Sequence, residues 1–191
     1  MFTGIVESTG TVVSLENDIL KIKTDNTQFF DLDSGTSIAI DGCCLTLKNY
    51  EKDILIFQVS DETLNRTALG DNHSGHVNME LPLTLNSLLS GHLVQGHVDE
   101  VIHIQSIKKL DSELWYFSFS NANKKYIVDK GSITINGISL TVVEPKDDSF
   151  SVAIIEETFN RTNLQHLSVD DAVNVEYDIV IKYLEKLNYD N

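Results

Sequence analysis

Apolar and polar residues alternate along short stretches of the chain. The clearest stretches are residues 9–15, 19–24, 36–40, 43–47 and 54–60, each of which alternates or is rich in β-branched side chains. This period of two is typical of half-buried β-strands, and turn-forming residues separate the stretches at short spacing. About six short strands with few helices predict a small barrel or sandwich.

The strand pattern occurs twice along the chain. Four segments recur in the same order, 92 to 96 positions apart: 3–8 with 95–100, 37–47 with 132–142, 62–67 with 157–162, and 77–80 with 173–176. This period is too long for a solenoid repeat and matches two whole domains. We expect an all-β protein with an N-terminal barrel over residues 1–88, a C-terminal barrel over 89–177 and a helix over 178–191.

Each repeat contains one predicted hairpin. Asp41-Gly42 and Asn136-Gly137 each stand between two strand patterns, and such pairs favour a two-residue type I′ turn. On the strand after each turn, side chains alternate between the two faces. The apolar rows are expected to fill the barrel cores: Cys43, Leu45 and Leu47 in the first copy, and Ile138, Leu140 and Val142 in the second.

The opposite face of these strands carries small polar residues. Cys44 and Thr46 share it in the first copy, and Ser139 and Thr141 share it in the second. The exchange of Cys44 for Ser139 therefore falls where core packing demands neither residue. The duplicated threonine beside it favours a site for chemistry, and a small filler without a role is the alternative.

The end of the chain has a helical pattern without a counterpart in the first repeat. Ile179, Tyr183 and Leu187 are four residues apart, and Val180 and Leu184 lie beside them on one apolar stripe. A short helix with such a stripe often packs against another subunit, so we expect an oligomer contact. Packing on its own barrel is the alternative.

Composition restricts the classes of partner. The chain has 191 residues, 41% of them hydrophobic, and a formal net charge of −15. Nucleic acid and anionic membranes bind basic faces, so this acidity argues against both. No apolar run approaches the roughly 20 residues of a membrane helix. The N-terminus lacks a signal-peptide pattern, and the two cysteines are adjacent, so we expect a reduced, cytoplasmic protein.

Two histidines lie in the segment 90–100, which reads SGHLVQGHVDE. His92 and His97 are five residues apart, and this spacing, without a third ligand nearby, is a weak metal signal. A histidine titrating near neutral pH serves as an acid, a base or a hydrogen-bond donor. Satisfying backbone groups at a domain junction is the structural alternative. No P-loop, GxGxxG, GxSxG or HExxH motif is present.

The repeated ETxNRT segment places Glu62, Thr63 and Arg66 in the first copy and the same residue types in the second. We interpret the two arginines as parts of a turn at a strand end. Lys130, just before the second hairpin, is by default a surface lysine.

The motifs together resemble the riboflavin synthases of the alpha-chain type. MFTGIVE at the start, DGCCLTL, ETLNRTALG, GHLVQGHVDE and NGISLTV carry the resemblance, which runs from Met1 to about Lys182. It implies two six-stranded Greek-key barrels, each binding one lumazine, in a homotrimer held by C-terminal helices. It also implies a productive site between the N-terminal barrel of one subunit and the C-terminal barrel of the next.

The reaction implied by the resemblance is a dismutation of two molecules of 6,7-dimethyl-8-ribityllumazine. One molecule gives a four-carbon unit to the other, and the products are riboflavin and 5-amino-6-ribitylamino-uracil. No metal or redox cofactor is expected. Two identical substrates must take different roles, so two similar pockets made unequal by the exchange of Cys44 for Ser139 suit this chemistry.

The resemblance also implies roles for single residues. The catalytic candidates are Cys44, His97, Ser139, Ser37 and His92. Expected substrate contacts of the first barrel are Gly4, Ile5, Val6, Leu45, Thr46, Glu62 and Thr63, and Gly96 and Val98 are expected as backbone contacts beside His97. Expected contacts of the second barrel are Lys130, Leu140, Thr141, Ala153, Ile155 and Thr158.

One departure from the family pattern affects the expected site. Asp41 stands where the first hairpin of the family has asparagine, and we expect its negative charge near the pocket. The competing function is that of lumazine proteins, which carry a bound lumazine or flavin without catalysis and typically lose the histidines or the cysteine. Retention of Cys44, His92 and His97 favours the synthase.

Overall fold

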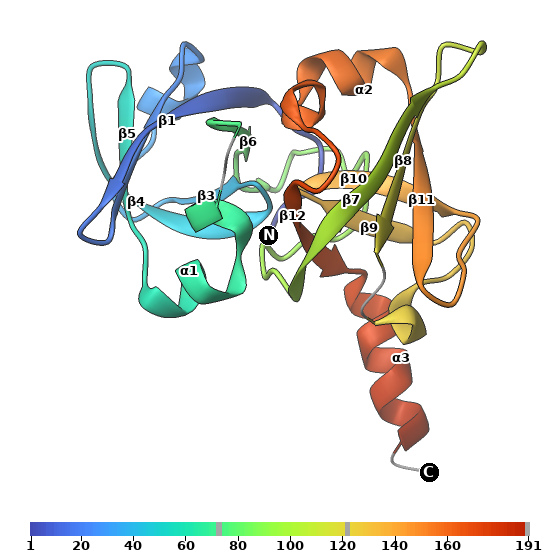
Figure 1. Cartoon of the computed structure of the whole chain (residues 1–191). Coiled ribbons are helices and arrows are strands. Elements are labelled where there is room, and N and C mark those ends of the chain that lie inside the picture. The colour runs from blue at the N-terminus through green and yellow to red at the C-terminus, as the bar shows by residue number, and fades with distance from the viewer. Residues whose placement is uncertain (72–73, 121–122, 190–191) are drawn as a thin grey trace.

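The computed structural model describes residues 1–71, 74–120 and 123–189, and it contains two β-barrels side by side (Figure 1). The strands of the first barrel are β1 (Ser8–Glu16), β2 (Ile19–Lys23), β3 (Ser37–Ile40), β4 (Cys43–Glu51), β5 (Ile54–Gln58) and β6 (His76–Glu80). Those of the second are β7 (Glu100–Lys109), β8 (Trp115–Ser120), β9 (Ser132–Ile135), β10 (Ile138–Val143), β11 (Ser149–Ile154) and β12 (Ala172–Tyr177).

Both barrels close with the same strand order. The first runs β1-β2-β5-β4-β3-β6, and the second has the same cyclic order with each number raised by six. All pairings between the named strands are antiparallel. The prediction of two tandem six-stranded barrels is confirmed. The expected boundary between residues 88 and 89 falls in the segment that connects β6 to β7.

Short helices lie at equivalent places in the two barrels, except for α3, which follows the second barrel only. The α-helices are α1 (Asp61–Arg66), α2 (Glu156–Arg161) and α3 (Ile179–Tyr189). The 3₁₀-helices are η1 (Thr27–Phe30), η2 (Ala68–Asp71), η3 (Lys124–Tyr126) and η4 (Asn163–His166). The two ETxNRT segments therefore form α1 and α2, not the strand-end turns expected from the sequence.

The predicted hairpin turns and strand faces are both confirmed. Asp41 and Gly42 have φ angles of 46° and 75°, and Asn136 and Gly137 have 45° and 78°, as a type I′ turn requires. The apolar rows of β4 and β10 belong to the buried cores of the two barrels, while Cys44 and Ser139 are partly exposed. The hairpin tips meet where the barrels join, because a Cβ on Gly42 would lie 2.7 Å from the backbone nitrogen of Gly137.

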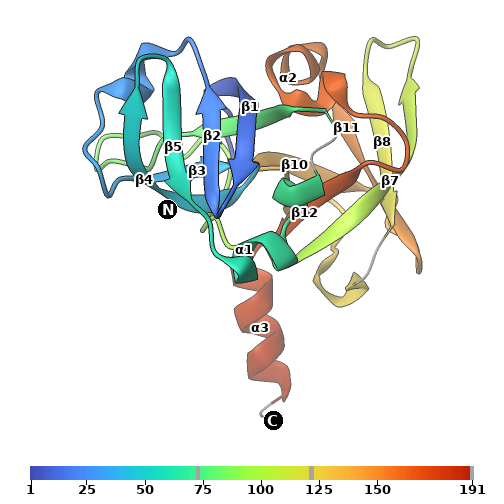
Figure 2. The same ribbon diagram turned by 60° about the vertical axis from the view of Figure 1, so that its left-hand side comes forward.

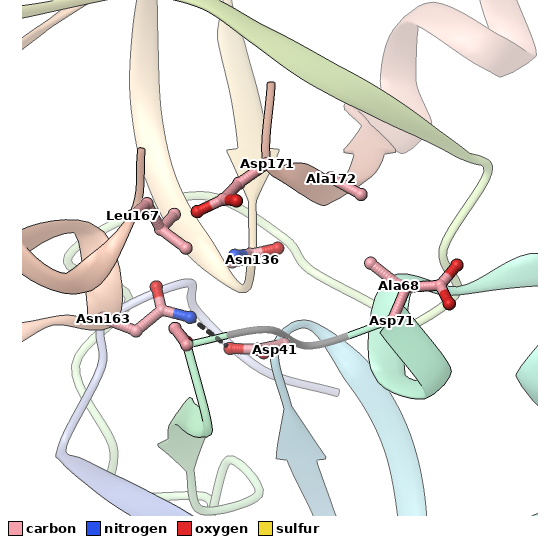
Figure 3. Close-up of a pocket in the computed structure, with 9 residues that line it drawn as sticks. Asp41, Ala68, Asp71, Asn136, Asn163, Leu167, Asp171 and Ala172 are labelled. Carbon is pink, nitrogen blue, oxygen red and sulfur yellow. Dashed lines mark hydrogen bonds between the residues drawn. The ribbon is translucent and has the colours of Figure 1, made fainter. Parts of the chain in front are cut away.

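Buried polar residues join the barrels around these tips (Figure 3). The side-chain oxygen Oδ1 of Asp41 accepts hydrogen bonds from the backbone N–H of Asn78 (2.7 Å) and the side-chain amide of Asn163 (3.0 Å). The side-chain amide of Asn174 donates to the Asp41 carbonyl, and that of Asn78 donates to the Asn136 carbonyl, both at 2.9 Å. Asp41 is thus buried at the barrel junction, where it lines a hollow of about 290 Å³ together with Asn136 and Asn163 (Figure 3). The expected effect of its charge on a ligand pocket stays a prediction.

The C-terminal helix α3 projects away from the second barrel (Figures 1 and 2). Lys182 pairs with Asp99 at 2.8 Å and Glu185 pairs with Lys125 at 3.0 Å, which ties one side of the helix to the barrel. Tyr183 and Leu184, on the predicted apolar stripe, are 64% and 56% exposed. Within the described part of the chain, the helices are too short or too polar to cross a membrane.

Candidate functional site

Two open hollows gather most of the residues singled out by the sequence. The Cys44 pocket, of about 470 Å³, is lined by Cys43, Cys44, Glu62, Thr63, Arg66, Thr67, Gly96, His97 and Val98. The Ser139 pocket, of about 540 Å³, is lined by Gly4, Ile5, Val6, Ile138, Ser139, Glu157, Thr158, Arg161 and Thr162.

The two pockets correspond residue by residue through the sequence repeat. Each is built from the start of a strand after a hairpin, a short helix, and a segment that precedes a barrel. Six of the nine positions carry the same residue in both. The three that differ are Cys43 against Ile138, Cys44 against Ser139, and His97 against Ile5. The Cys44 pocket therefore holds a thiol and an imidazole where the Ser139 pocket holds a hydroxyl and an aliphatic side chain.

The segments that precede the barrels cross to the opposite barrel. We call residues 1–7 the N-terminal strap and residues 92–99 the linker strap. The backbone N–H of Ser139 donates to the Gly4 carbonyl at 2.7 Å, and that of Cys44 donates to the Gly96 carbonyl at 2.8 Å. Phe2 and Val94 pair in an antiparallel bridge where the straps pass each other.

This crossing corrects one sequence-based assignment. Gly4, Ile5 and Val6 were expected to serve the first barrel together with Glu62 and Thr63. They line the Ser139 pocket of the second barrel instead, and Val6 packs against the core of that barrel. The physical reason is that each strap precedes the first strand of its own barrel but pairs with β4 or β10 of the other.

Two strap glycines have no room for a side chain. A Cβ on Gly96 would lie 2.6 Å from the Cβ of Cys44, and one on Gly4 would lie 2.7 Å from that of Ser139. Their φ angles of 80° and 76° also lie in the left-handed region, which favours glycine. The close approach brings the strap backbone directly over the residue that distinguishes each pocket.

The helices α1 and α2 each contribute an arginine to a pocket, although the sequence pattern favoured a purely structural role for both arginines. Arg66 pairs with Glu62 at 3.4 Å, and Arg161 pairs with Glu157 at 3.1 Å. Both side chains are more than 60% exposed at the pocket edge, so these i,i+4 pairs contribute little to stability and leave the arginines available to a ligand. The exact repetition of ETxNRT was the signal that pointed to them.

The two candidate histidines lie at different pockets. His97 is exposed in the Cys44 pocket, while His92 lies behind the Ser139 pocket. The Nδ1 atom of His92 is 2.7 Å from the Ser139 hydroxyl, and its Nε2 atom is 3.2 Å from the Thr134 hydroxyl. Burial lowers the pKa of His92, against the opposing charge of Asp178, so its imidazole is suited to hold the Ser139 hydroxyl in place without a charge.

The two cysteines also differ in character. Cys43 is 7% exposed in the barrel core, and burial raises the pKa of its thiol to about 12, so it is a poor nucleophile. Cys44 is partly exposed and faces the pocket. Among the described residues, no group of three or more histidine, cysteine, aspartate or glutamate side chains is arranged to hold a metal ion.

Other expected contacts lie outside the lining of these pockets. Leu45 and Leu140 belong to the barrel cores, so only their backbone atoms remain for a ligand. Neither lining includes the remaining candidates, which stay predictions: Ser37, Thr46, Lys130, Thr141, Ala153 and Ile155.

One known domain family matches both halves of the chain. The lumazine binding domain matches residues 3–82 and again residues 95–178. Solved structures of LumP complexed with riboflavin and with 6,7-dimethyl-8-(1'-D-ribityl) lumazine superpose with TM-scores of 0.83 and 0.81, at 26% and 25% identity. These matches cover 93% and 92% of this chain and 99% and 98% of the LumP chains.

Curated relatives are similar to this chain over nearly its whole length. The riboflavin synthase of Actinobacillus pleuropneumoniae is 39% identical over 97% of this chain and 89% of its own length. That of Mycobacterium bovis is 39% identical over 98% of both chains. With two lumazine binding domains and such similarity across nearly its whole length, the chain belongs to the riboflavin synthase family.

Proposed function

We propose that the protein is a riboflavin synthase that converts two molecules of 6,7-dimethyl-8-ribityllumazine into riboflavin and 5-amino-6-ribitylamino-uracil. The observation that carries the proposal is the pair of homologous pockets that differ at three lining positions. Two copies of one substrate need two binding pockets of similar shape. The transfer of a four-carbon unit between them needs the copies to take unequal roles, and the unequal side chains supply that difference.

The chemistry requires a proton to leave the C7 methyl group of a lumazine and a nucleophile to add at C7 of a lumazine. Cys44 and His97, together in one pocket, are the candidates for these tasks. In the other pocket, His92 holds the Ser139 hydroxyl at 2.7 Å. The transfer itself is an exchange between the two substrates, so the products together contain all the atoms of the reactants.

The pockets of one chain face apart. Helix α1 borders the Cys44 pocket and α2 borders the Ser139 pocket, and in both views α1 lies at the lower side of the barrel pair and α2 at the upper side (Figures 1 and 2). A face-to-face pair of lumazines therefore needs the Cys44 pocket of one subunit and the Ser139 pocket of another. This supports a homotrimer held by the exposed stripe of α3, and the adjacent free cysteines support a cytoplasmic location.

A non-catalytic lumazine or flavin carrier is the second candidate. It is favoured by the likeness to LumP, whose complexes contain riboflavin or a lumazine. A carrier should purify coloured and fluorescent with bound ligand. The synthase is preferred because Cys44, His97 and the His92–Ser139 pair are all in place.

The test is direct. Purified protein is mixed with 6,7-dimethyl-8-ribityllumazine, with and without EDTA, and riboflavin is followed by absorbance. We expect one riboflavin for every two lumazines consumed, at a rate that EDTA does not change. Tight binding of lumazine without riboflavin would move the protein to the carrier class.

A further inference from the structure

A buried glutamate on the last strand of the second barrel holds the linker strap. Glu176, on β12, is 2% exposed. Its carboxylate accepts hydrogen bonds from three successive backbone N–H groups: those of Gln95 (2.6 Å), Gly96 (2.8 Å) and His97 (2.9 Å). Two of these three residues line the Cys44 pocket. The backbone of the pocket wall is therefore bound to a single side chain.

The first barrel repeats this arrangement. Glu80, on β6, is 5% exposed. It accepts hydrogen bonds from the backbone N–H groups of Thr3 (2.6 Å) and Gly4 (3.0 Å), and from the Thr3 hydroxyl (2.7 Å). Gly4 lines the Ser139 pocket. Each glutamate thus belongs to one barrel and holds the wall of the pocket on the other.

The carboxylate is difficult to replace in this role. Oε1 of Glu176 accepts from Gln95, and Oε2 accepts from both Gly96 and His97. A glutamine would place an NH₂ group, which accepts nothing, at one of these oxygen positions. At least one buried backbone N–H would lose its acceptor, which weakens the hold on the strap. Burial raises the pKa of both glutamates, while the strap hydrogen bonds lower it.

We propose that Glu176 is a positioning residue that fixes Gly96 and His97 of the linker strap against Cys44, and that Glu80 does the same for Gly4 and Ile5 against Ser139. The docking of the two barrels thereby sets the geometry of both pockets. The catalytic consequence rests on the proposed function, but the position of the strap can be measured without any lumazine.

Cys44 is a natural reporter of the linker strap. The Gly96 backbone covers it so closely that a Cβ on Gly96 would lie 2.6 Å from the Cβ of Cys44. We would measure the rate at which a thiol reagent modifies Cys44 in the full-length protein, with the modified residue identified by mass spectrometry. In Glu176→Gln we expect this rate to rise about three-fold or more, because Cys44 is already partly exposed to the pocket and the lost hydrogen bond to a charged group further opens the strap that covers the rest of it.

Glu80→Gln is the matched control, because it makes the same chemical change at the other strap. We expect Cys44 in this variant to react at the wild-type rate. Thermal unfolding of both variants reports any loss of the overall fold, because Cys43, which also lines the Cys44 pocket, can respond to local opening. If Glu176→Gln does not yield folded protein, Glu176→Asp keeps the charge but shortens the side chain, and a smaller rise at Cys44 is expected.

The outcomes separate the possibilities. Faster modification of Cys44 in Glu176→Gln alone, with the thermal unfolding transition retained, supports the proposal. An unchanged rate in the Glu176 variants, or an equal rise in Glu80→Gln, overturns it. Riboflavin formation should fall in both glutamine variants, because each loses one pocket wall. Wild-type protein that makes no riboflavin would refute the proposed function, while the thiol result would still decide the role of Glu176.

Discussion

Three residue exchanges give the two pockets different chemistry on the same frame. Cys44, His97 and Cys43 in one pocket stand where Ser139, Ile5 and Ile138 stand in the other. Sequence comparison of the hairpins alone identified the exchange of cysteine for serine. The repeat of residues 3–8 at 95–100 also aligns Ile5 with His97, but only the crossing of the straps shows which pocket each of the two residues enters.

Replacement of Cys44 tests its role in turnover. Cys44→Ser gives the first pocket the residue that the second already has, and the site is partly exposed, so the fold should be retained. We expect riboflavin formation to slow by about 100-fold, the usual contribution of a group that transfers a proton or adds as a nucleophile. Steady-state rates, with thermal unfolding as the control for folding, provide the measurement. A wild-type rate would exclude Cys44 from the chemistry.

Asp41 makes a second residue-scale prediction. Burial raises its pKa from the ordinary value of 3.8 to about 8, although the backbone N–H of Asn78 opposes this. The folded protein thus keeps a proton that the unfolded chain releases. Its contribution to the free energy of unfolding is complete below about pH 4 and is lost as the pH rises through about 8.

Asp41→Asn should remove this pH dependence. The equivalent Asn136 already accepts a hydrogen bond from the backbone N–H of Asn174 at 2.8 Å, so an amide fits this turn. We expect the variant to be more stable at neutral and alkaline pH, by an amount on the order of 1 kcal/mol or more, with little difference near pH 4. Urea unfolding across this range measures both effects. Parallel curves for the two proteins would contradict the assignment.

At the scale of elements, the straps and the short helices α1 and α2 complete the walls of the two pockets on the barrels. The barrels alone supply Cys44 and Ser139, while the straps add His97 and Ile5, and α1 and α2 add the exposed arginines. The straps hydrogen-bond to the opposite barrel, while α1 and α2 pack against the cores of their own barrels through Leu64 and Phe159.

Gly96→Ala tests the fit of the linker strap. The new methyl group would meet the Cβ of Cys44 at 2.6 Å, so the strap must move and turnover should fall by about ten-fold or more. Gly35→Ala is the control, because Gly35 also has a left-handed φ, of 95°, but a Cβ there meets nothing within 4 Å. Both variants should lose about 1 kcal/mol of stability from backbone strain. Equal activities in the two variants would argue against the strap as a pocket wall.

At the scale of the whole molecule, two features call for further subunits. The helices that border the two pockets, α1 and α2, lie at opposite sides of the barrel pair, and α3 extends from the second barrel with an exposed apolar stripe (Figures 1 and 2). A stripe of this kind is stabilised when another subunit covers it. Assembly and catalysis should therefore be linked.

A charge on the stripe should separate the subunits. Leu184→Glu places a carboxylate on the apolar face, where its desolvation in an interface is unfavourable, so sedimentation should show smaller species and riboflavin formation should fall with them. Asn188→Glu adds the same charge to the same helix beside the stripe and should leave the assembly intact. Full activity in a monomeric Leu184→Glu variant would contradict catalysis between subunits.

The sequence by itself determined the local structure and the duplication. Strand alternation predicted which side chains of β4 and β10 are buried, and Asp-Gly and Asn-Gly predicted the left-handed turns at 41–42 and 136–137. These features depend on neighbouring residues along the chain, and the repeat could be read directly. The assignment to two barrels followed, because a repeated pattern of six strands needs two separate cores.

Only the tertiary structure decided how the repeats combine. It placed Ile5 beside Ser139, His97 beside Cys44, and Asp41 at the junction of the barrels, outside the linings of both the Cys44 and the Ser139 pockets. It also showed that Glu80 and Glu176 hold the straps. These contacts join residues about 50 to 135 positions apart across the docking surface of the two barrels. Alternation along a strand carries no information about that surface, because it records only which side of one barrel a residue faces.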